Sequence, residues 1–183
     1  MRSDEQLMQD VSGGDRDAFA KLIKRHETTA MNVAFRILGD YSRAEEVAQE
    51  AFLKIFDAAD DYEPSAQFKT YLCRVVARLC YDRSEKNEPS YSDDLDRVSE
   101  ANHRDNNHSP LEQLVDRERQ EKIQQALNGL PIRQRLAISL QHFEGMSYEE
   151  IAEVMDTSEK SVERLLHRAR GTLRDELESY IQE

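Results

Sequence analysis

The sequence predicts an all-α protein made of two helical modules joined by a flexible acidic linker. Apolar residues recur three and four positions apart through most of the chain, as on one face of a helix, and no segment alternates as a strand does. Serine and aspartate N-caps precede several of these runs. The pattern is interrupted at residues 84–109, which are rich in Asn, Ser and Asp and hold few apolar side chains.

Composition supports small modules rather than one thick core, because the chain is 38% hydrophobic and 34% charged, with a mean hydropathy of −0.81. The net charge of −12 by itself argues against a protein that coats nucleic acid, although much of the acidic excess lies in residues 84–118. The sequence has no apolar run of the ~20 residues that span a membrane and no secretory signal. Its two cysteines are too few for a disulfide framework. We therefore expect a soluble cytoplasmic protein without stable membrane insertion.

Four helices are predicted in the first module, residues 1–83. Ser3 and Gln6 have the spacing of a capping box, which begins a short helix that ends at the glycine pair 13–14. Asp15 is the predicted cap of a long second helix, and Gly39 is its predicted end.

The third helix of this module is predicted to begin at a second capping box, formed by Ser42 and Glu45. An acidic loop around Pro64 breaks the periodicity. The fourth helix is predicted from about Gln67 to Arg83, and it holds both cysteines.

The second module, residues 110–183, is also predicted to be helical. Its helix starts are predicted at Pro110 after the cap Ser109, at Pro131, at the capping box Ser147–Glu150, and at Ser158. The last two helices, joined by a short turn in SYEEIAEVMDTSEKSVERLLHRAR (residues 147–170), have the pattern of a helix-turn-helix.

Within this helix-turn-helix, the small Ala152 allows a close helix crossing that Ile151, Val162 and Leu166 fill. The outward residues of its second helix are Ser161, Arg164, His167, Arg168 and Arg170. Arginines on such a face can read guanine edges or hold phosphates in a major groove. An ordinary helical hairpin with solvated arginines remains the alternative.

Two further surfaces have a functional and a plain interpretation. Glu45, Glu46, Gln49 and Glu50 cover the outer face of the third helix, either as a solubilising face or as a docking surface for a basic partner. On the fourth helix, the basic residues Lys69, Arg74, Arg78 and Arg83 alternate with Tyr71 and Tyr81. Aromatic rings beside arginines can stack unpaired bases, whereas Tyr71 as a core residue is the plain alternative.

An enzyme is not predicted. The five histidines are scattered, none has a ligand spacing with cysteine or a carboxylate, and there is no glycine-rich phosphate loop or nucleophile motif. We therefore expect no catalytic residue, no metal and no cofactor.

The order of three segments in the first module resembles region 2 of bacterial extracytoplasmic-function (ECF) sigma factors: AFAKLIKRH, RILGDYSRAEEVAQEAFLKIF and FKTYLCRVVARLCYDR. The segment ALNGLPIRQRLAISLQHFEGMSYEEIAEVMDTSEKSVERLLHRARGTLRDEL resembles region 4 of the same family. The two resemblances cover essentially the whole chain, with a linker at 84–109 where the family has a variable one.

The resemblance implies a sigma factor that binds core RNA polymerase, directs it to the −10 and −35 promoter elements and opens the −10 region. It implies that polymerase is bound by Glu46, Gln49 and Glu50, the −10 strand by Tyr62, Lys69, Tyr71, Arg74 and Arg78, and the −35 element by Ser161, Arg164, His167 and Arg168. A spacer of about 17 base pairs then separates the elements by about 58 Å.

The sequence departs from the family pattern at four positions on the predicted DNA-binding helices. Tyr71 stands where tryptophan is usual and keeps a stacking ring, whereas Arg78 stands where asparagine is frequent. Lys160 replaces a common glycine and Glu163 a common basic residue. We therefore expect this chain to recognise promoter bases that differ from those usual in the family.

The resemblance also implies an anti-sigma partner, wedged between the two modules, that holds the sigma factor inactive. The linker would let the modules close around such a partner or on each other, and we expect closure to cover the Glu46 and Arg164 faces together. A stand-alone helix-turn-helix regulator and a helical adaptor without a DNA role remain alternative functions, and binding to core polymerase distinguishes all three.

Overall fold

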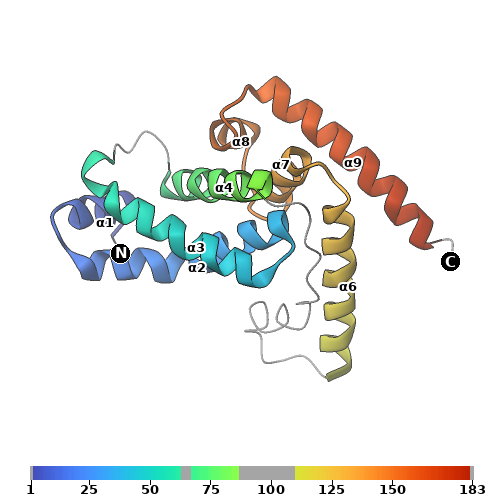
Figure 1. The fold of residues 1–183 in the computed structure, drawn as a ribbon, viewed down its shortest axis with the longest axis horizontal. Coiled ribbons are helices and arrows are strands. Elements are labelled where there is room, and N and C mark those ends of the chain that lie inside the picture. Colours follow the sequence, from blue (N-terminus) through green and yellow to red (C-terminus); the bar gives the residue numbers. More distant parts are fainter. Residues whose placement is uncertain (1, 63–66, 87–109, 182–183) are drawn as a thin grey trace.

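All regular structure is helical in the computed structural model, which describes residues 2–62, 67–86 and 110–181 (Figure 1). No strand is present in these ranges, so the all-α prediction is confirmed there. The elements are α1 (Asp4–Ser12), α2 (Arg16–Leu38), α3 (Tyr41–Asp57), the 3₁₀ turn η1 (Ala59–Asp61), α4 (Phe68–Lys86), α6 (Pro110–Asn128), α7 (Ile132–His142), α8 (Tyr148–Val154) and α9 (Glu159–Ile181).

The helices form two bundles, an N-terminal bundle of α1–α4 and a C-terminal bundle of α6–α9. In the N-terminal bundle α1, α3 and α4 all pack on α2, and in the C-terminal bundle α7 and α8 pack on α9. Apolar residues at helical spacing supply both interiors, including Leu22, Ile55 and Phe68 in the first and Leu136 and Leu166 in the second.

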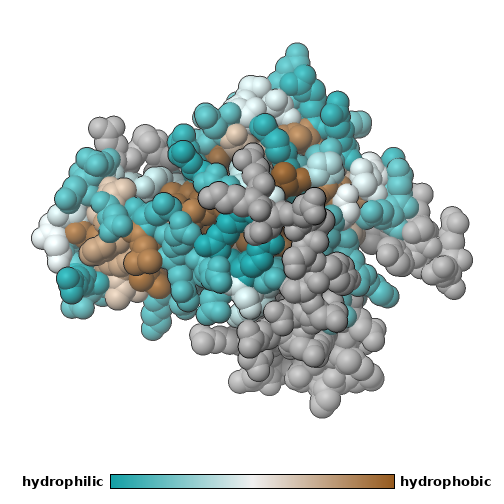
Figure 2. All heavy atoms as spheres, viewed as in Figure 1, coloured by the Kyte–Doolittle hydropathy of each residue, from teal (hydrophilic) through white to brown (hydrophobic). Residues whose placement is uncertain are grey.

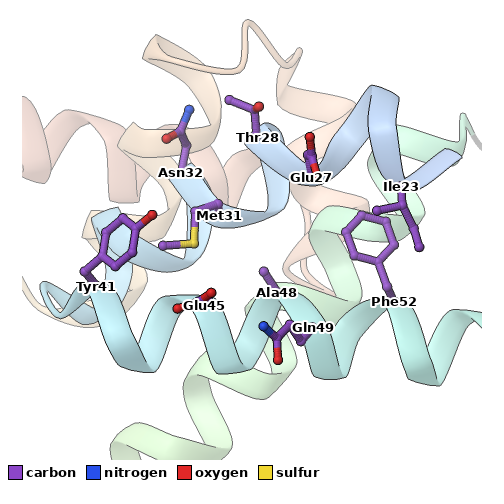
Figure 3. Close-up of a pocket in the computed structure, with 10 residues that line it drawn as sticks. All are labelled: Ile23, Glu27, Thr28, Met31, Asn32, Tyr41, Glu45, Ala48, Gln49 and Phe52. Carbon is purple, nitrogen blue, oxygen red and sulfur yellow. The ribbon is translucent and has the colours of Figure 1, made fainter. Parts of the chain in front are cut away.

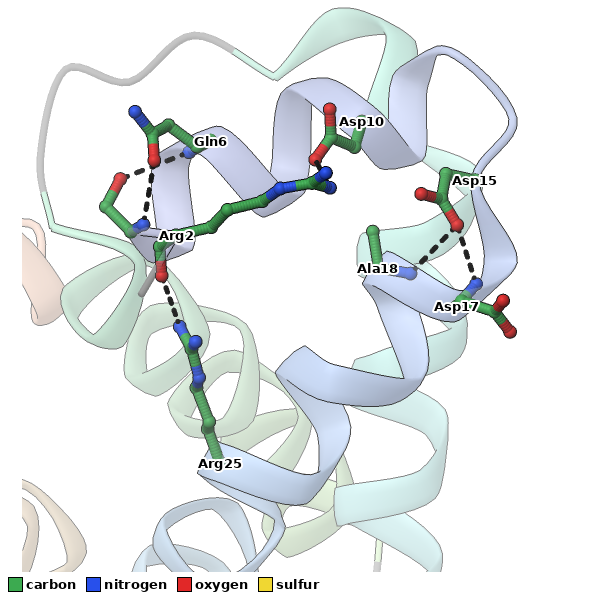
Figure 4. Close-up of polar contacts among 8 residues, drawn as sticks. Arg2, Gln6, Asp10, Asp15, Asp17, Ala18 and Arg25 are labelled. Carbon is green, nitrogen blue, oxygen red and sulfur yellow. Dashed lines mark hydrogen bonds and ion pairs between the residues drawn. The ribbon is translucent and has the colours of Figure 1, made fainter.

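The predicted caps of α1 and α2 are confirmed (Figure 4). The Ser3 hydroxyl accepts from the Gln6 main-chain N–H at 3.2 Å, and the Gln6 side chain accepts from the Ser3 N–H at 3.0 Å. Asp15 accepts from the N–H groups of Asp17 and Ala18. Each cap therefore satisfies helix N–H groups that have no partner within the helix.

The predicted capping box at the start of α3 is wrong. Asp40 is the N-cap, and its carboxylate accepts from the Arg43 N–H at 2.9 Å. The preceding Gly39 adopts φ +68° and ends α2 with a hydrogen bond from its N–H to the Phe35 carbonyl. Because of this left-handed turn, the next residue, Asp40, occupies the cap position, two residues before the predicted cap Ser42.

The fourth helix runs to Lys86, three residues beyond its predicted end, and the Ser84 hydroxyl donates to the Cys80 carbonyl within it. Two earlier predictions lie outside the described residues: the linker character of residues 87–109 and the cap at Ser109. Residues 63–66 of the acidic loop are also outside them.

The caps predicted in the second module are confirmed where they are described. Ser147 and Glu150 exchange the two hydrogen bonds of a capping box. The Ser158 hydroxyl accepts from the Ser161 N–H at 3.3 Å, directly before α9. Pro131 precedes the first residue of α7.

The two bundles pack on each other, with α7 on α2 and α8 on α4 (Figure 1). Their buried apolar residues form one continuous cluster. Figure 2 shows apolar side chains at the surface of the N-terminal bundle. On α3, Leu53 is 63% and Phe56 37% exposed. No helix in the described ranges is long and apolar enough to cross a membrane.

Gly39→Ala should destabilise the protein, because a Cβ at φ +68° is strained and would lie 2.9 Å from the Asn128 side-chain oxygen of the C-terminal bundle. We expect the free energy of unfolding to fall by about 1–2 kcal/mol in urea titrations. Gly171→Ala is the matched control. Gly171 lies inside α9 with nothing near its Cβ position, so alanine there should add about 0.5–1 kcal/mol. Equal effects of both changes would contradict this account.

Candidate functional site

An arginine of α4 forms ion pairs with two carboxylates on the acidic face of α3. Glu46 and Gln49 are exposed, and Glu50 is half-buried. Arg83 places one nitrogen 3.1 Å from a Glu46 oxygen and the other 2.8 Å from a Glu50 oxygen. Both carboxylates are therefore oriented together on one surface, and their charge is partly offset by a single guanidinium.

A groove between α2 and α3 borders this acidic face (Figure 3). It has a volume of about 360 Å³, and Glu45, Gln49 and Tyr41 of α3 face Glu27 and Met31 of α2 across it. Its floor is apolar and its rim is acidic and amide-bearing. Such a surface suits a basic partner that also carries apolar side chains.

An aromatic pair marks the surface predicted to meet the −10 strand. The rings of Tyr62 and Tyr71 lie 5.4 Å apart, centre to centre. Both residues are half-buried, and burial raises the pKa of both phenols. The Tyr62 hydroxyl is buried with no hydrogen-bond partner among the described residues. Tyr71 thus packs against another ring and still has part of its surface exposed.

The predicted −10 residues of α4 do not all share one side of the helix. Tyr71, Arg74 and Arg78 are spaced by three and four residues, so they lie on one side, where both arginines are exposed. Lys69 precedes Tyr71 by two residues and lies on the opposite side. There its Nζ lies 3.0 Å from a carboxylate oxygen of Glu144 and donates to the Glu144 main-chain oxygen at 2.9 Å.

Helices α8 and α9 form the predicted helix-turn-helix. Ile151, Ala152, Val162 and Leu166 are all buried, as the sequence predicted. The turn contains Asp156 at φ +49°, a left-handed conformation that aspartate tolerates better than most residues.

The outward side of α9 is basic. Arg164, His167 and Arg168 are exposed, and Ser161 is half-buried and accepts from Arg164 at 3.2 Å. A groove of about 440 Å³ runs along this side, lined by Tyr148, Glu163, Arg164, His167, Arg168 and Arg170. The Arg170 guanidinium donates a hydrogen bond to the side-chain oxygen of Gln141 at 2.7 Å. The four −35 residues predicted from sequence therefore lie together on one exposed face.

Residues at the contact between the bundles were not identified from sequence. Glu144, in the turn after α7, pairs with Arg36 of α2 at 3.2 Å as well as with Lys69 of α4. The Arg36 guanidinium also lies 3.9 Å above the Phe143 ring, and burial lowers the pKa of Arg36. Arg36 and Glu144 are 108 positions apart in the chain, and no local pattern links them.

The end of α2 is completed by the C-terminal bundle. Arg135 donates to the Ile37 carbonyl at 2.6 Å, and Gln124 donates to the Arg36 carbonyl at 3.4 Å. These are carbonyls of the last turn, which have no partner within the helix. The contact between the bundles is therefore polar and directional as well as apolar.

When the modules close on each other, they do not cover the Glu46 and Arg164 faces together, so the expectation is wrong for this form of closure. The bundles are closed on each other, yet Glu46 is exposed on α3 and Arg164 on α9. Closure uses α7 and α8 against α2 and α4, which are other sides of both bundles. The predicted residue that closure does engage is Lys69.

Both cysteines are free and buried in α4. Burial raises the pKa of each thiol to about 12, so neither is a reactive nucleophile in this structure. No group of three or more side chains able to hold a metal ion was found in the described part of the chain.

The two bundles correspond to two known sequence families. Residues 22–89 match Sigma-70 region 2, and residues 120–173 match Sigma-70 region 4. The ECF RNA polymerase sigma factor SigW of Bacillus subtilis is 30% identical over 175 residues, which cover 91% of this chain and 92% of that protein. This chain belongs to the ECF sigma factor family. The RNA polymerase sigma-H factor of Pseudomonas aeruginosa is 29% identical, over 98% of this chain and 96% of that protein.

Two solved structures share the fold of this chain. CnrH, in its complex with the cytosolic domain of CnrY, superposes with a TM-score of 0.75 at 23% identity, covering 97% of this chain and 99% of that one. The sigma factor RpoE of Bartonella quintana, in complex with the anti-sigma factor NepR, gives a TM-score of 0.66 at 20% identity, covering 87% and 96%. As a sigma factor, the chain is a transcription initiation factor and not an enzyme.

Proposed function

We propose that this sigma factor recruits core RNA polymerase through its first module, residues 1–83, and places it on promoters through both modules. The proposal is carried by the separation of charge on the surface. An acidic face lies on α3, within the region 2 match, and a basic face lies at the start of α9, within the region 4 match. Opposite charges on separate modules suit one protein partner and one DNA partner.

The proposed polymerase contact consists of Glu46, Gln49 and Glu50. Arg83 supports it by holding both carboxylates at fixed positions, so less side-chain entropy is lost on binding. The neighbouring groove and the exposed Leu53 supply the apolar surface that a stable protein interface needs.

The proposed −10 surface opens the promoter by capturing bases of one strand. Tyr62 and Tyr71 offer rings for stacking, and Arg74 and Arg78 track the backbone of the displaced strand. Lys69 joins this surface only when Glu144 releases it, because the two groups are paired in the closed arrangement.

The proposed −35 contact is the second helix of the helix-turn-helix, with Ser161, Arg164, His167 and Arg168 in the major groove. Glu163 in the same groove favours a −35 sequence different from that of most relatives, since a carboxylate accepts from cytosine rather than from guanine. Residues 110–183 form this second module in the proposal, with residues 84–109 as the linker between the modules.

An anti-sigma factor is a proposed third partner, and the proposed location is the cytoplasm, where polymerase and promoters are found. RpoE of Bartonella quintana shares the fold of this chain and was solved with an anti-sigma factor, and CnrH, which also shares the fold, was solved with the cytosolic domain of a second protein. A protein that binds between the modules would compete with promoter engagement by keeping them together.

Arg164→Ala tests the −35 assignment. A promoter is first selected from a random DNA pool by this chain bound to purified bacterial core polymerase, and the affinity of each holoenzyme for it is then measured. Losing a base-edge contact should weaken binding by about 1–3 kcal/mol and relax selection at one −35 position. Arg174→Ala removes the same charge from an exposed site further along α9 and should leave the selected base unchanged. Equal effects of the two variants would refute the assignment, and selection without polymerase would favour a stand-alone regulator.

A further inference from the structure

Glu144 joins the two bundles through a partly buried ion-pair cluster. Its carboxylate bridges Arg36 of α2 and Lys69 of α4, at 3.2 Å and 3.0 Å. The exposed fraction of the side chain is 9% for Glu144, 17% for Arg36 and 32% for Lys69. One residue of the C-terminal bundle thus holds two helices of the N-terminal bundle.

The turn that carries Glu144 has a fixed shape. Helix α7 ends at His142, Gly145 adopts φ +68°, and the Met146 N–H donates back to the Leu140 carbonyl at 3.2 Å. This is the left-handed helix ending that glycine permits. Lys69 also binds the main-chain oxygen of Glu144, so the turn is held by its backbone as well as by its side chain.

The closed arrangement does not fit simultaneous binding of both promoter elements. Helix α8 packs on α4, and α9 packs on α8, so two helix-to-helix steps of about 8–10 Å place the start of α9 roughly 20 Å from α4. The −10 and −35 elements are about 58 Å apart along B-form DNA. The bundles must therefore separate, and separation breaks the Glu144 cluster.

We propose that Arg36, Glu144 and Lys69 form an autoinhibitory latch that keeps the free chain closed and withholds Lys69 from the promoter strand until polymerase binds. The proposal rests on the function proposed above for the two modules. Removing the Glu144 charge leaves two partly buried cations facing each other without a counter-charge. The closed form should then lose stability relative to the open form, while each bundle keeps its own core.

Cysteine labelling measures the opening directly in the full chain. Cys73 is 1% exposed, and Glu144 is near enough that its charge adds to the effect of burial in raising the pKa of this thiol. Cys80 lies two helical turns further along the same side of α4, and its neighbour Tyr81 borders Ile132, Arg133 and Met155 of the C-terminal bundle. Trypsin cleaves after Arg74 and Arg78, so the two thiols fall in different peptides, and mass spectrometry gives each alkylation rate separately.

Glu144→Gln should raise the alkylation rate of Cys73 about tenfold, and it should raise the rate of Cys80, on the same side of α4, in the same direction. Glu144→Asp, whose shorter carboxylate cannot reach both cations, should give an intermediate rate. Glu153→Gln removes the same charge from an exposed position on α8 and should match the native chain. An unchanged Cys73 rate in Glu144→Gln would overturn the latch, as would the same acceleration in Glu153→Gln.

Titration with core polymerase tests whether the latch inhibits. Since an apparent dissociation constant is the intrinsic one divided by the competent fraction, Glu144→Gln should bind core up to about tenfold more tightly than the native chain. Faster Cys73 labelling with unchanged core affinity would overturn inhibition by the latch. If no variant bound core, the proposed function would fail, whereas the labelling result would still report on the contact.

Discussion

Glu46→Lys combined with Glu50→Lys should abolish binding to core RNA polymerase. Losing one member of a charge pair that is buried at an interface costs about 2–5 kcal/mol, so two reversals should weaken binding by at least 100-fold. A fluorescence titration of labelled chain with core measures the effect. Retention of normal affinity would exclude this face of α3 as the docking site.

The structure makes a control necessary for this experiment, because both carboxylates pair with Arg83. The double reversal sets two lysines beside that arginine, and it should lower the free energy of unfolding by about 1–2 kcal/mol through lost and repulsive surface pairs. Arg83→Gln breaks the same two ion pairs and leaves the acidic face intact. We expect it to lose part of the stability and only a small part of the core affinity, because both carboxylates remain although Arg83 no longer holds them in place, and this separates docking from folding.

Tyr71→Ala should impair promoter opening and leave the closed promoter complex nearly unchanged. Stacking of a base on an aromatic ring is worth about 1–3 kcal/mol, and the Tyr71 ring is partly exposed beside Tyr62. Permanganate, which oxidises unpaired thymines, measures the opened region on a selected promoter. Normal permanganate reactivity in the alanine variant would exclude a stacking role.

Tyr71→Phe is the matched control, since it keeps the ring and removes only the hydroxyl. We expect near-normal opening from it. Tyr71 also packs against the core of the N-terminal bundle, so core affinity should be measured for both variants. An alanine variant that binds core as the native chain does, yet opens the promoter poorly, would locate the defect in strand capture.

The caps show how far local sequence rules extend. Ser3, Asp15 and Ser147 cap helices as predicted. At α3 both Asp40 and Ser42 have cap chemistry, and the sequence spacing favoured Ser42. The left-handed Gly39 decides for Asp40, since the helix restarts directly after it.

The predicted surfaces differ in how much local periodicity could say about them. The four residues predicted to contact the −35 element lie together because they belong to one helix turn after another, which spacing alone predicts. Lys69 was grouped with Tyr71, Arg74 and Arg78 by residue type and resemblance, although it lies on the other side of α4. Its partner Glu144 comes from the other bundle, and no spacing rule connects the two.

The sequence by itself determined the helical class, most helix starts, the composition of both cores and the exposed faces of α3 and α9. These properties depend on periodicity and capping, which act over a few residues. Only the tertiary structure decided how the bundles meet, that Arg83 holds Glu46 and Glu50, and that Glu144 holds Arg36 and Lys69. Those contacts join residues that are distant in the chain, and they form only where packing of the two cores brings their charges together and removes them from water.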